Sequence, residues 1–563
     1  MNQHAENAQI DGIGVSPGLV VGPVAHMGEG IKEPSATVRY DGDPELAREQ
    51  IAQAAAATKA GLEAMAERAS GEGRAVLEMT AQMAGDKSLI KNAAKLVANE
   101  NLTPARAVWQ AALAIGEQLE SLGGYMAERT RDVADVRDRI VARLTGQDLP
   151  GIPDLPEPFV LVARDLAPAD TALLDPEKVI GIVTAEGGPT SHTAILARDL
   201  GIPAIVGVGG AAAATLPNGT YVLVDGSKGT VKTNPSVEDM ERVAALKGIK
   251  RTFSGKGLTK DGHHVQLLGN VGDAASAKAA ASAGAEGVGL FRTEFAFLDK
   301  AEEPSHAEQV AAYRAVFAEF PGKKVVVRTL DAGADKPLPF VTDYEEENPA
   351  LGVRGFRTAK THPHVLTNQL AALAAAAQEE QADVWVMTPM IATLPETEQF
   401  IELCSQVGLT TAGIMIEVPS AALTADRLLA KAQFASIGTN DLTQYAMAAD
   451  RMLGSLAELS TVWQPGVLSL IAATCEGGRK NDRPVGVCGE SAADPALAVV
   501  LVGLGVKSLS MTSRALPDVA MVLESLTLAE CQHIAQVALQ AADAEHAKAA
   551  ARALIPVLEE LGL

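Results

Sequence analysis

Short apolar runs recur along the second half of the chain, and helical or irregular segments separate them. They lie at residues 265–268, 287–290, 325–327, 384–387, 413–416, 434–437, 485–487 and at Leu509. About eight strands in roughly 300 residues are the number and length of a (β/α)8 TIM barrel. The run at Leu509 is poorly marked, so a doubly wound open sheet is the competing architecture.

The first part of the chain predicts an α/β domain with a helical block inserted into it. Strand-like runs occur at residues 10–24, 159–163, 179–183, 204–207 and 221–225. Residues 44–144 instead are rich in Ala, Glu, Gln, Arg and Leu, with apolar positions at helical spacing. Breaks at 71–73, 85–86 and 102–104 would separate the helices of this block. Such an insertion is tolerated when the ends of the host loop stay close together.

Charge and cysteine content narrow the class of protein. The net charge is −23, which repels nucleic acid and anionic membranes, so an anionic substrate needs a local cluster of Arg, Lys or metal. The four cysteines are scattered without a CxxC pair, which argues against a zinc site or a disulfide framework. No signal peptide or long apolar run is apparent. We therefore expect a cytoplasmic, multi-domain protein that binds neither nucleic acid nor membrane.

Chemically active side chains follow the predicted strands of the second half. The strand ends carry Asn270, Arg292, Glu294, Arg328, Asp331, Met390, Glu417, Asn440, Asp441, Cys488 and Glu490. In a barrel these C-terminal strand ends form the active site. Arginine forks suit phosphate or carboxylate oxygens, and Lys336 and Arg354 could join them. Each charged group could instead be a structural ion pair, but so many at one mouth favour a functional site.

Three of these positions have a specific chemical interpretation. Glu417 and Asp441 are hard oxygen donors, and Mg²⁺ commonly takes one or two carboxylates together with substrate phosphate. Cys488 ends the predicted strand at 485–487, where a buried, inert thiol is the default. Beside a cationic cluster, a role in proton transfer is the alternative.

A glycine-rich turn with one histidine occurs in the first half. His192 lies in Gly-Gly-Pro-Thr-Ser-His-Thr-Ala, between the apolar run 179–183 and a helix-like segment over 194–200. A helix N-terminus favours an anion such as phosphate, and a neutral imidazole there could attack phosphorus. A histidine that merely caps the helix is the alternative.

Together these segments resemble Enzyme I, the phosphoenolpyruvate-protein phosphotransferase of the bacterial sugar phosphotransferase system. The segments that carry the resemblance are 16–18, 132–138, 187–193, 287–295, 328–331, 348–352, 436–445 and 487–490. They spread almost from end to end of the chain. The family often has Arg where this chain has Pro189, which puts in doubt a role of that side chain in charge stabilisation.

The resemblance implies a role for each matching residue. His192 would take the phosphoryl group of phosphoenolpyruvate (PEP), and Cys488 would protonate the enolate carbon as pyruvate forms. Glu417 and Asp441 would bind Mg²⁺. The substrate-binding residues would be Arg292, Arg328, Lys336, Arg354, Asn440, Asp441 and Arg451.

The resemblance also implies the domains and partners. Residues 1–29 and 147–233 would form the swivelling phosphohistidine domain, and residues 30–146 the inserted helical domain that binds the phosphocarrier protein HPr. Residues 234–257 would be a linker helix, and 258–563 the PEP-binding barrel, through which the chain would form a homodimer. The alternatives are an enzyme like pyruvate phosphate dikinase or PEP synthase, for which the helical block is too small, or a degenerate PEP-sensing regulator.

Overall fold

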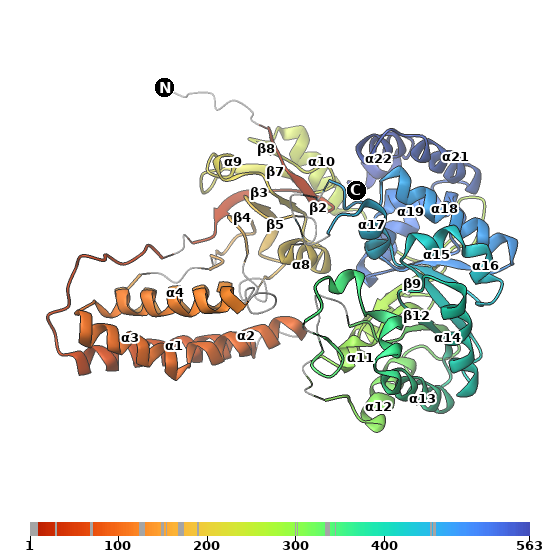
Figure 1. Ribbon diagram of the computed structural model, residues 1–563. Coiled ribbons are helices and arrows are strands. Elements are labelled where there is room, and N and C mark those ends of the chain that lie inside the picture. Colours follow the sequence, from red (N-terminus) through yellow and green to blue (C-terminus); the bar gives the residue numbers. More distant parts are fainter. Residues whose placement is uncertain are drawn as a thin grey trace. The chain divides into compact units, whose positions relative to one another are not determined.

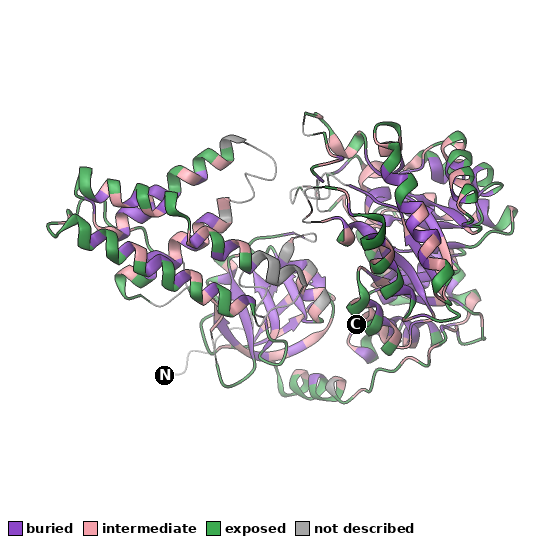
Figure 2. Ribbon diagram, turned by 90° about the horizontal axis from the view of Figure 1, so that it is seen from below, coloured by how far each residue is buried: buried purple, intermediate pink, exposed green. Residues whose placement is uncertain are grey.

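The computed structural model of the chain describes residues 9–563 except 29–30, 68–70, 123–129, 148–150, 154, 167–173, 189–190, 299, 301, 333–337, 344, 451–452, 454–455 and 457. It divides into two compact units, Met1–Ala245 and Leu246–Leu563 (Figure 1). In both units the buried residues concentrate in the strands and on the inner faces of the helices (Figure 2).

The second unit is a closed barrel of parallel strands. Its strands are β9 (Gln266–Val271), β10 (Val288–Arg292), β11 (Lys324–Arg328), β12 (Asp383–Thr388), β13 (Ala412–Ile416), β14 (Ala435–Ile437), β15 (Val485–Val487) and β16 (Ser508–Met511). The barrel closes because β16 pairs with β9, from Ser508 opposite Gln266 to Met511 opposite Gly269. All the predicted runs are strands, so the barrel is confirmed and the open sheet is excluded.

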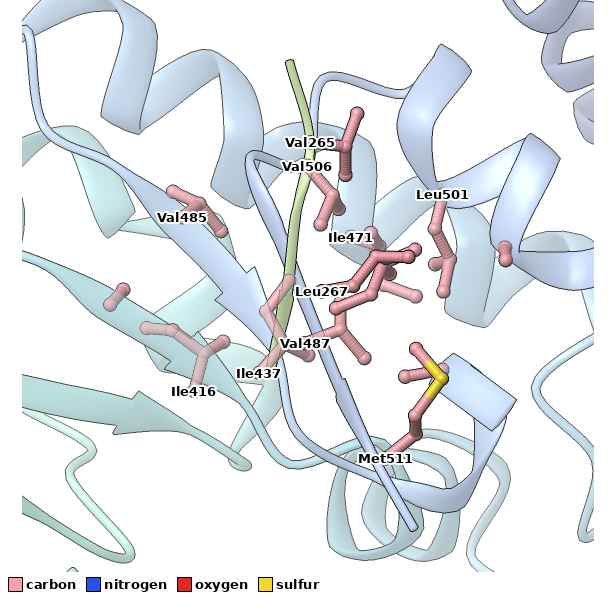
Figure 3. Packing of buried hydrophobic residues seen from close by; sticks show 14 of the residues in the cluster. Val265, Leu267, Ile416, Ile437, Ile471, Val485, Val487, Leu501, Val506 and Met511 are labelled. Atoms are coloured by element: carbon pink, nitrogen blue, oxygen red, sulfur yellow. The ribbon is translucent and has the colours of Figure 1, made fainter. Parts of the chain in front are cut away.

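Helices surround the barrel strands. They are α11 (Ala274–Ser282), α12 (His306–Phe317), α13 (Pro363–Glu379), α14 (Leu394–Gln406), α15 (Pro419–Leu423), α16 (Ala425–Leu429), α17 (Thr439–Met447), α18 (Pro465–Lys480), α19 (Pro495–Gly503), α20 (Leu516–Glu524), α21 (Leu528–Leu539), α22 (Ala544–Ala553) and α23 (Val557–Leu561). Strand residues such as Leu267 and Val487 pack against helical residues such as Ile471 and Leu501 (Figure 3). This packing is the main core of the unit and holds the strand ends in place.

The first unit contains a mixed sheet. Its strands are β1 (Gln9–Asp11), β2 (Ile13–Ser16), β3 (Leu19–His26), β4 (Phe159–Ala163), β5 (Val179–Thr184), β6 (Ala204–Val206), β7 (Tyr221–Asp225) and β8 (Thr230–Thr233), in the order β1-β8-β7-β3-β4-β5-β6-β2. The parallel neighbours β3 and β4 are separated in sequence by the whole helical block. The predicted α/β domain with an insertion is therefore confirmed, although β8, which is short and has three polar residues out of four, was not predicted.

The inserted block is helical, as predicted. Its described helices are α1 (Pro44–Ala66), α2 (Gly71–Ala84), α3 (Lys87–Glu100), α4 (Pro104–Leu122) and α6 (Thr130–Thr145). The breaks predicted at 85–86 and 102–104 are confirmed. The break predicted at 71–73 is wrong, because these residues form the first turn of α2.

The predicted connecting helix is present as α10 (Val237–Lys247). It is shorter than the linker helix expected over 234–257, because the structure has no helix at residues 248–257. The division between the units falls within the predicted linker, residues 234–257. Among the described residues, no helix combines the length and the apolar character that crossing a membrane requires.

Candidate functional site

His192 is the first residue of a helix that follows a strand and a turn. The strand β5 ends at Thr184, and α8 (His192–Leu200) begins eight residues later. Ser191 caps this helix, because its Oγ accepts from the N–H of Ala194 at 3.3 Å. The turn uses Gly187 at φ +103°, a conformation that favours glycine. The histidine therefore stands at the N-terminus of α8 without being its cap.

Arg328 lies at the mouth of the barrel, at the end of β11. Its guanidinium pairs with Glu294, and its Nη1 lies 3.8 Å from Asp331 Oδ2. Its Nε is buried and has no hydrogen-bond partner among the described residues. Arg292, at the end of β10, is the register partner of Arg328 on the neighbouring strand. A buried N–H without a partner is costly, so this side chain suits an additional acceptor such as a phosphate oxygen.

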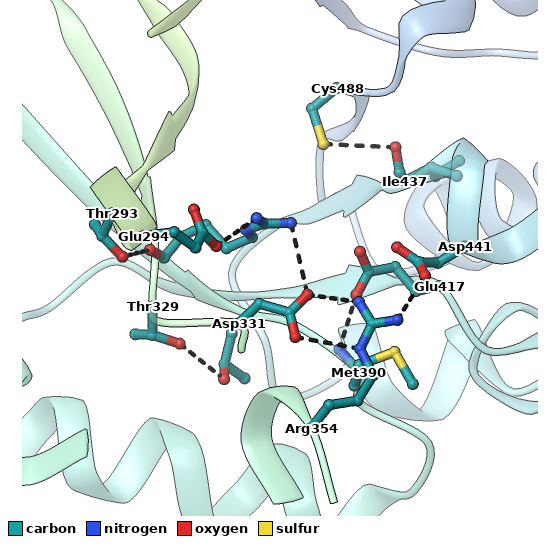
Figure 4. A network of polar contacts seen from close by, with 12 residues as sticks. Thr293, Glu294, Thr329, Asp331, Arg354, Met390, Glu417, Ile437, Asp441 and Cys488 are labelled. Carbon is teal, nitrogen blue, oxygen red and sulfur yellow. Dashed lines mark hydrogen bonds and ion pairs between the residues drawn. The ribbon is translucent and has the colours of Figure 1, made fainter. Parts of the chain in front are cut away.

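Arg354 links two carboxylates that follow different strands, Asp331 after β11 and Asp441 after β14. Its Nη2 lies 2.7 Å from Asp331 Oδ2, and its Nη1 lies 2.8 Å from Asp441 Oδ1 (Figure 4). The arginine is only 5% exposed. The next residue is Gly355 at φ +56°, where a Cβ would lie 2.8 Å from Met390 Cβ. Glycine at 355 thus lets the segment pass close enough for Arg354 to reach both carboxylates.

Glu417 is a buried carboxyl group after β13. The N–H of Met390 donates to its Oε2 at 2.8 Å. Burial, together with the negative charges of Asp441 and Asp331, raises the pKa of Glu417 to about 8. Arg328 and Arg354 oppose this rise. A carboxyl group in such surroundings gains stability from any added cation.

Cys488 follows β15 and is 2% exposed. Its Sγ lies 3.6 Å from the carbonyl oxygen of Ile437 (Figure 4). Burial raises the pKa of the thiol to about 11, although Ser436, Arg328 and Arg292 lower it. Asn270 donates to the Cys488 carbonyl at 3.2 Å and so fixes the main chain there. At neutral pH the sulfur therefore carries its proton, as a proton donor must.

Three family models of PEP-utilising enzymes match this chain. The N-terminal model matches residues 11–129, the mobile domain 155–229 and the PEP-binding domain 247–528. A phosphoenolpyruvate-protein phosphotransferase of Streptomyces coelicolor is 49% identical over 97% of this chain and 98% of its own length. The chain belongs to the phosphoenolpyruvate-protein phosphotransferase family. Two further phosphotransferases of that name are also similar. The protein of Haloferax volcanii is 40% identical over 94% of this chain and 97% of its own length. The protein of Bacillus subtilis is 34% identical over 93% of this chain and 95% of its own length.

PEP-utilising enzymes use a divalent metal, and the mouth of this phosphotransferase fits one. The cluster contains Arg292, Arg328 and Arg354 against Glu294, Asp331, Glu417 and Asp441. When all are ionised, three positive charges face four negative ones, so a divalent cation would make the cluster attractive to an anion. Within the described ranges, no three His, Cys, Asp or Glu side chains gather in a group that could hold a metal by themselves.

The structure brings together most of the predicted site residues of this phosphotransferase. Those at the barrel mouth are Arg292, Arg328, Arg354, Glu417, Asp441 and Cys488, and Asn440 precedes Asp441 in α17. Lys336, Arg451 and Pro189 lie outside the described residues, as does the side chain of His192. The predicted roles of all these residues remain predictions.

Sequence reasoning placed Glu294 and Asp331 at the mouth without assigning them a role. The structure shows that both hold arginines. Sequence reasoning did not identify Gln369. This residue of α13 is fully buried and contacts Thr293 and Leu330. One signal was available: Gln369 is a polar residue on the face of the helix that also carries Val365, Leu366 and Leu373.

Proposed function

We propose that this phosphotransferase transfers the phosphoryl group of PEP to His192, releases pyruvate, and passes the phosphoryl group to a histidine of the phosphocarrier protein HPr. This would be the first step of sugar uptake by the phosphotransferase system. The observation that carries the proposal is the buried cluster at the barrel mouth, in which Arg328 Nε has no hydrogen-bond partner among the described residues. The mobile-domain match over 155–229, which includes His192, supports the same step.

The loading step needs positioning and charge neutralisation more than covalent help. Arg292 and Arg328 would hold the phosphoryl oxygens with planar, permanently charged groups. The neutral ring nitrogen of His192 attacks phosphorus, so an N–P bond forms while the bond between phosphorus and the enol oxygen breaks. That oxygen keeps the electron pair, and the pyruvate enolate leaves.

Cys488 would complete the reaction by giving its proton to the methylene carbon of the enolate. Its raised pKa keeps the thiol protonated until the enolate, a strong carbon base, is formed. The positive charges of Arg292 and Arg328 would then stabilise the thiolate. Lys336, Arg354, Asn440, Asp441 and Arg451 would fix the rest of the substrate.

We assign Mg²⁺ to Glu417 and Asp441. The two carboxylates are hard oxygen donors, and Glu417 is destabilised as an anion by burial and by its acidic neighbours. When bound, the ion would neutralise charge on the phosphate of PEP. In this structure Asp441 pairs with Arg354, which holds its carboxylate at the mouth.

The histidine and the barrel belong to different units, joined by the segment that contains α10. His192 would therefore visit the barrel mouth and then turn to HPr, a domain motion that takes microseconds to milliseconds. HPr would dock on the inserted helical domain, and the barrel would form a homodimer. The cytoplasm is the expected site of action, since all four cysteines are free.

The test is incubation with PEP, Mg²⁺ and purified HPr. We expect pyruvate release together with an acid-labile phosphoryl group on His192, which then passes to HPr. The His192→Ala variant should form no phosphoenzyme. Labelling of His192 from ATP and not from PEP would instead support an enzyme like pyruvate phosphate dikinase. Unchanged pyruvate release by His192→Ala would contradict the mechanism.

A further inference from the structure

One buried amide connects the two segments that follow the strands ending in Arg292 and Arg328. Gln369 of α13 is 0% exposed. Its Nε2 donates to Thr293 Oγ1 at 3.0 Å, and its Oε1 accepts from the N–H of Leu330 at 2.8 Å. Thr293 follows β10, and Leu330 follows β11. A single side chain therefore ties together the segments after two neighbouring strands.

The direction of the hydrogen bonds requires an amide at this position. The hydroxyl of Thr293 donates to the carbonyl of Arg328 at 2.8 Å, so it must accept from Gln369. The second Nε2 proton goes to Tyr313 Oη at 3.1 Å. Tyr313 in turn donates to Gln309 Oε1 at 3.1 Å, and Gln309 donates to the carbonyl of Pro304 at 3.0 Å. Residue 369 must thus supply two protons and one acceptor, as only Asn and Gln side chains can.

The residues beside these contacts are the carboxylates that hold the arginines. Glu294, next to Thr293, pairs with Arg328. Asp331, next to Leu330, pairs with Arg354 and lies 3.8 Å from Arg328. A shift of either loop would move a carboxylate and the guanidinium that it holds. Phosphoryl transfer depends on such placement, and misplacement of about 1 Å can cost on the order of 100-fold in rate.

We propose that Gln369 is a positioning residue for PEP, which acts by locking the loops after β10 and β11 in the arrangement that presents Arg292 and Arg328 to the phosphoryl group. The proposal rests on the proposed function. It concerns only the loading step at the barrel, because the transfer between His192 and HPr does not involve this unit. That separation distinguishes positioning from a general loss of fold.

The test compares three variants in the full-length enzyme. Gln369→Met keeps the volume and removes every hydrogen bond of the amide. Gln369→Glu keeps the shape but supplies at most one proton where the amide supplies two. Gln309→Met is the matched control, because it removes two hydrogen bonds at the far end of the same network, away from Thr293 and Leu330.

We expect both Gln369 variants to raise the KM for PEP about tenfold, equivalent to about 1.4 kcal/mol. Exchange of the phosphoryl group between phospho-HPr and His192 should keep its wild-type rate. Gln309→Met should lower the Tm similarly and leave KM within about twofold. If Gln369→Met does not fold, Thr293→Val cuts the same link to Arg328 and should raise KM as well.

A KM for PEP that stays within about twofold of wild type in the folded Gln369 variants would overturn the proposal, as would an equal rise in Gln309→Met. A loss of exchange with phospho-HPr in parallel with the loading step would show a general defect and would also overturn it. If the wild-type enzyme itself forms no phosphohistidine from PEP, the proposed function fails, which separates that failure from a failure of the positioning role.

Discussion

Arg354 Nη1 lies 2.8 Å from Asp441 Oδ1, although 87 residues separate the two in the sequence. The same guanidinium lies 2.7 Å from Asp331. One buried cation therefore compensates two buried carboxylates that come from different strand ends. Asp441 is also a proposed metal ligand, so the arginine sets the position of a carboxylate that the ion would share.

The variant Arg354→Met should destabilise the barrel strongly. It leaves Asp331 and Asp441 buried without their cation, and breaking a buried pair in this way typically costs about 3–5 kcal/mol. Urea unfolding of the full-length protein measures the effect. The control Arg479→Met removes an exposed arginine that pairs with Glu476 and should change the free energy of unfolding by less than about 0.5 kcal/mol. Similar values for the two variants would contradict the bridging role.

Replacing Arg328 by lysine should reduce kcat/KM for PEP by about 10²–10³-fold, the loss expected when one preorganised donor group is removed. Lysine retains the charge but lacks the planar fork that can bind Glu294 and a phosphate oxygen together. Steady-state pyruvate release measures the change. Arg314→Lys, on the exposed face of α12, should retain wild-type kinetics. A loss of less than threefold for Arg328→Lys would refute its role.

Cys488→Ala should slow pyruvate formation by about 10²–10⁴-fold, the usual contribution of a general acid. The wild-type thiol should react slowly with iodoacetamide at pH 7, because it is 2% exposed and its pKa is raised to about 11. Mass spectrometry of the alkylated peptide checks this. Cys404→Ala, in α14 away from the strand ends, is the control and should retain the rate. Full activity of Cys488→Ala would require another proton donor.

The proposed assignment of Mg²⁺ to Glu417 and Asp441 predicts a metal requirement that depends on pH through Glu417. Below its raised pKa of about 8 a proton competes with the ion, so the Mg²⁺ concentration for half-maximal activity should fall about tenfold per pH unit up to about pH 8. Above that pH it should level off. The same raised pKa means that this group's contribution to stability is lost as pH rises from 4.5 to about 8 in the metal-free protein.

Titration calorimetry measures the affinity for Mg²⁺ at a series of pH values between pH 6 and 9. This range of about three pH units includes the raised pKa of Glu417, about 8. Glu417→Gln should weaken Mg²⁺ binding and remove the slope. A slope that persists in Glu417→Gln would assign the titration to another group.

Much of the fold could be predicted from the pattern of apolar residues. The runs at 384–387 and 413–416 are buried β strands, and their number indicated a barrel. Closure was predicted from the number of runs alone, and its least marked strand was β16, where Ser508 and Ser510 interrupt the apolar pattern. Only the pairing of β16 with β9 excludes an open sheet. The break expected at 71–73 was wrong because glycine at a helix start and glycine between helices look alike in sequence.

The sequence by itself determined which residues lie at the strand ends. A charged residue directly after a buried barrel strand lies where that strand ends, at the mouth of the barrel. The sequence also indicated a turn between a strand and a helix around His192, and the structure makes His192 the first residue of that helix. Only the tertiary structure decided that Arg354 holds Asp331 and Asp441 and that Gln369 ties Thr293 to Leu330. Such contacts join residues far apart in the chain, and they depend on strand register and the path of each loop, which no local pattern of side chains encodes.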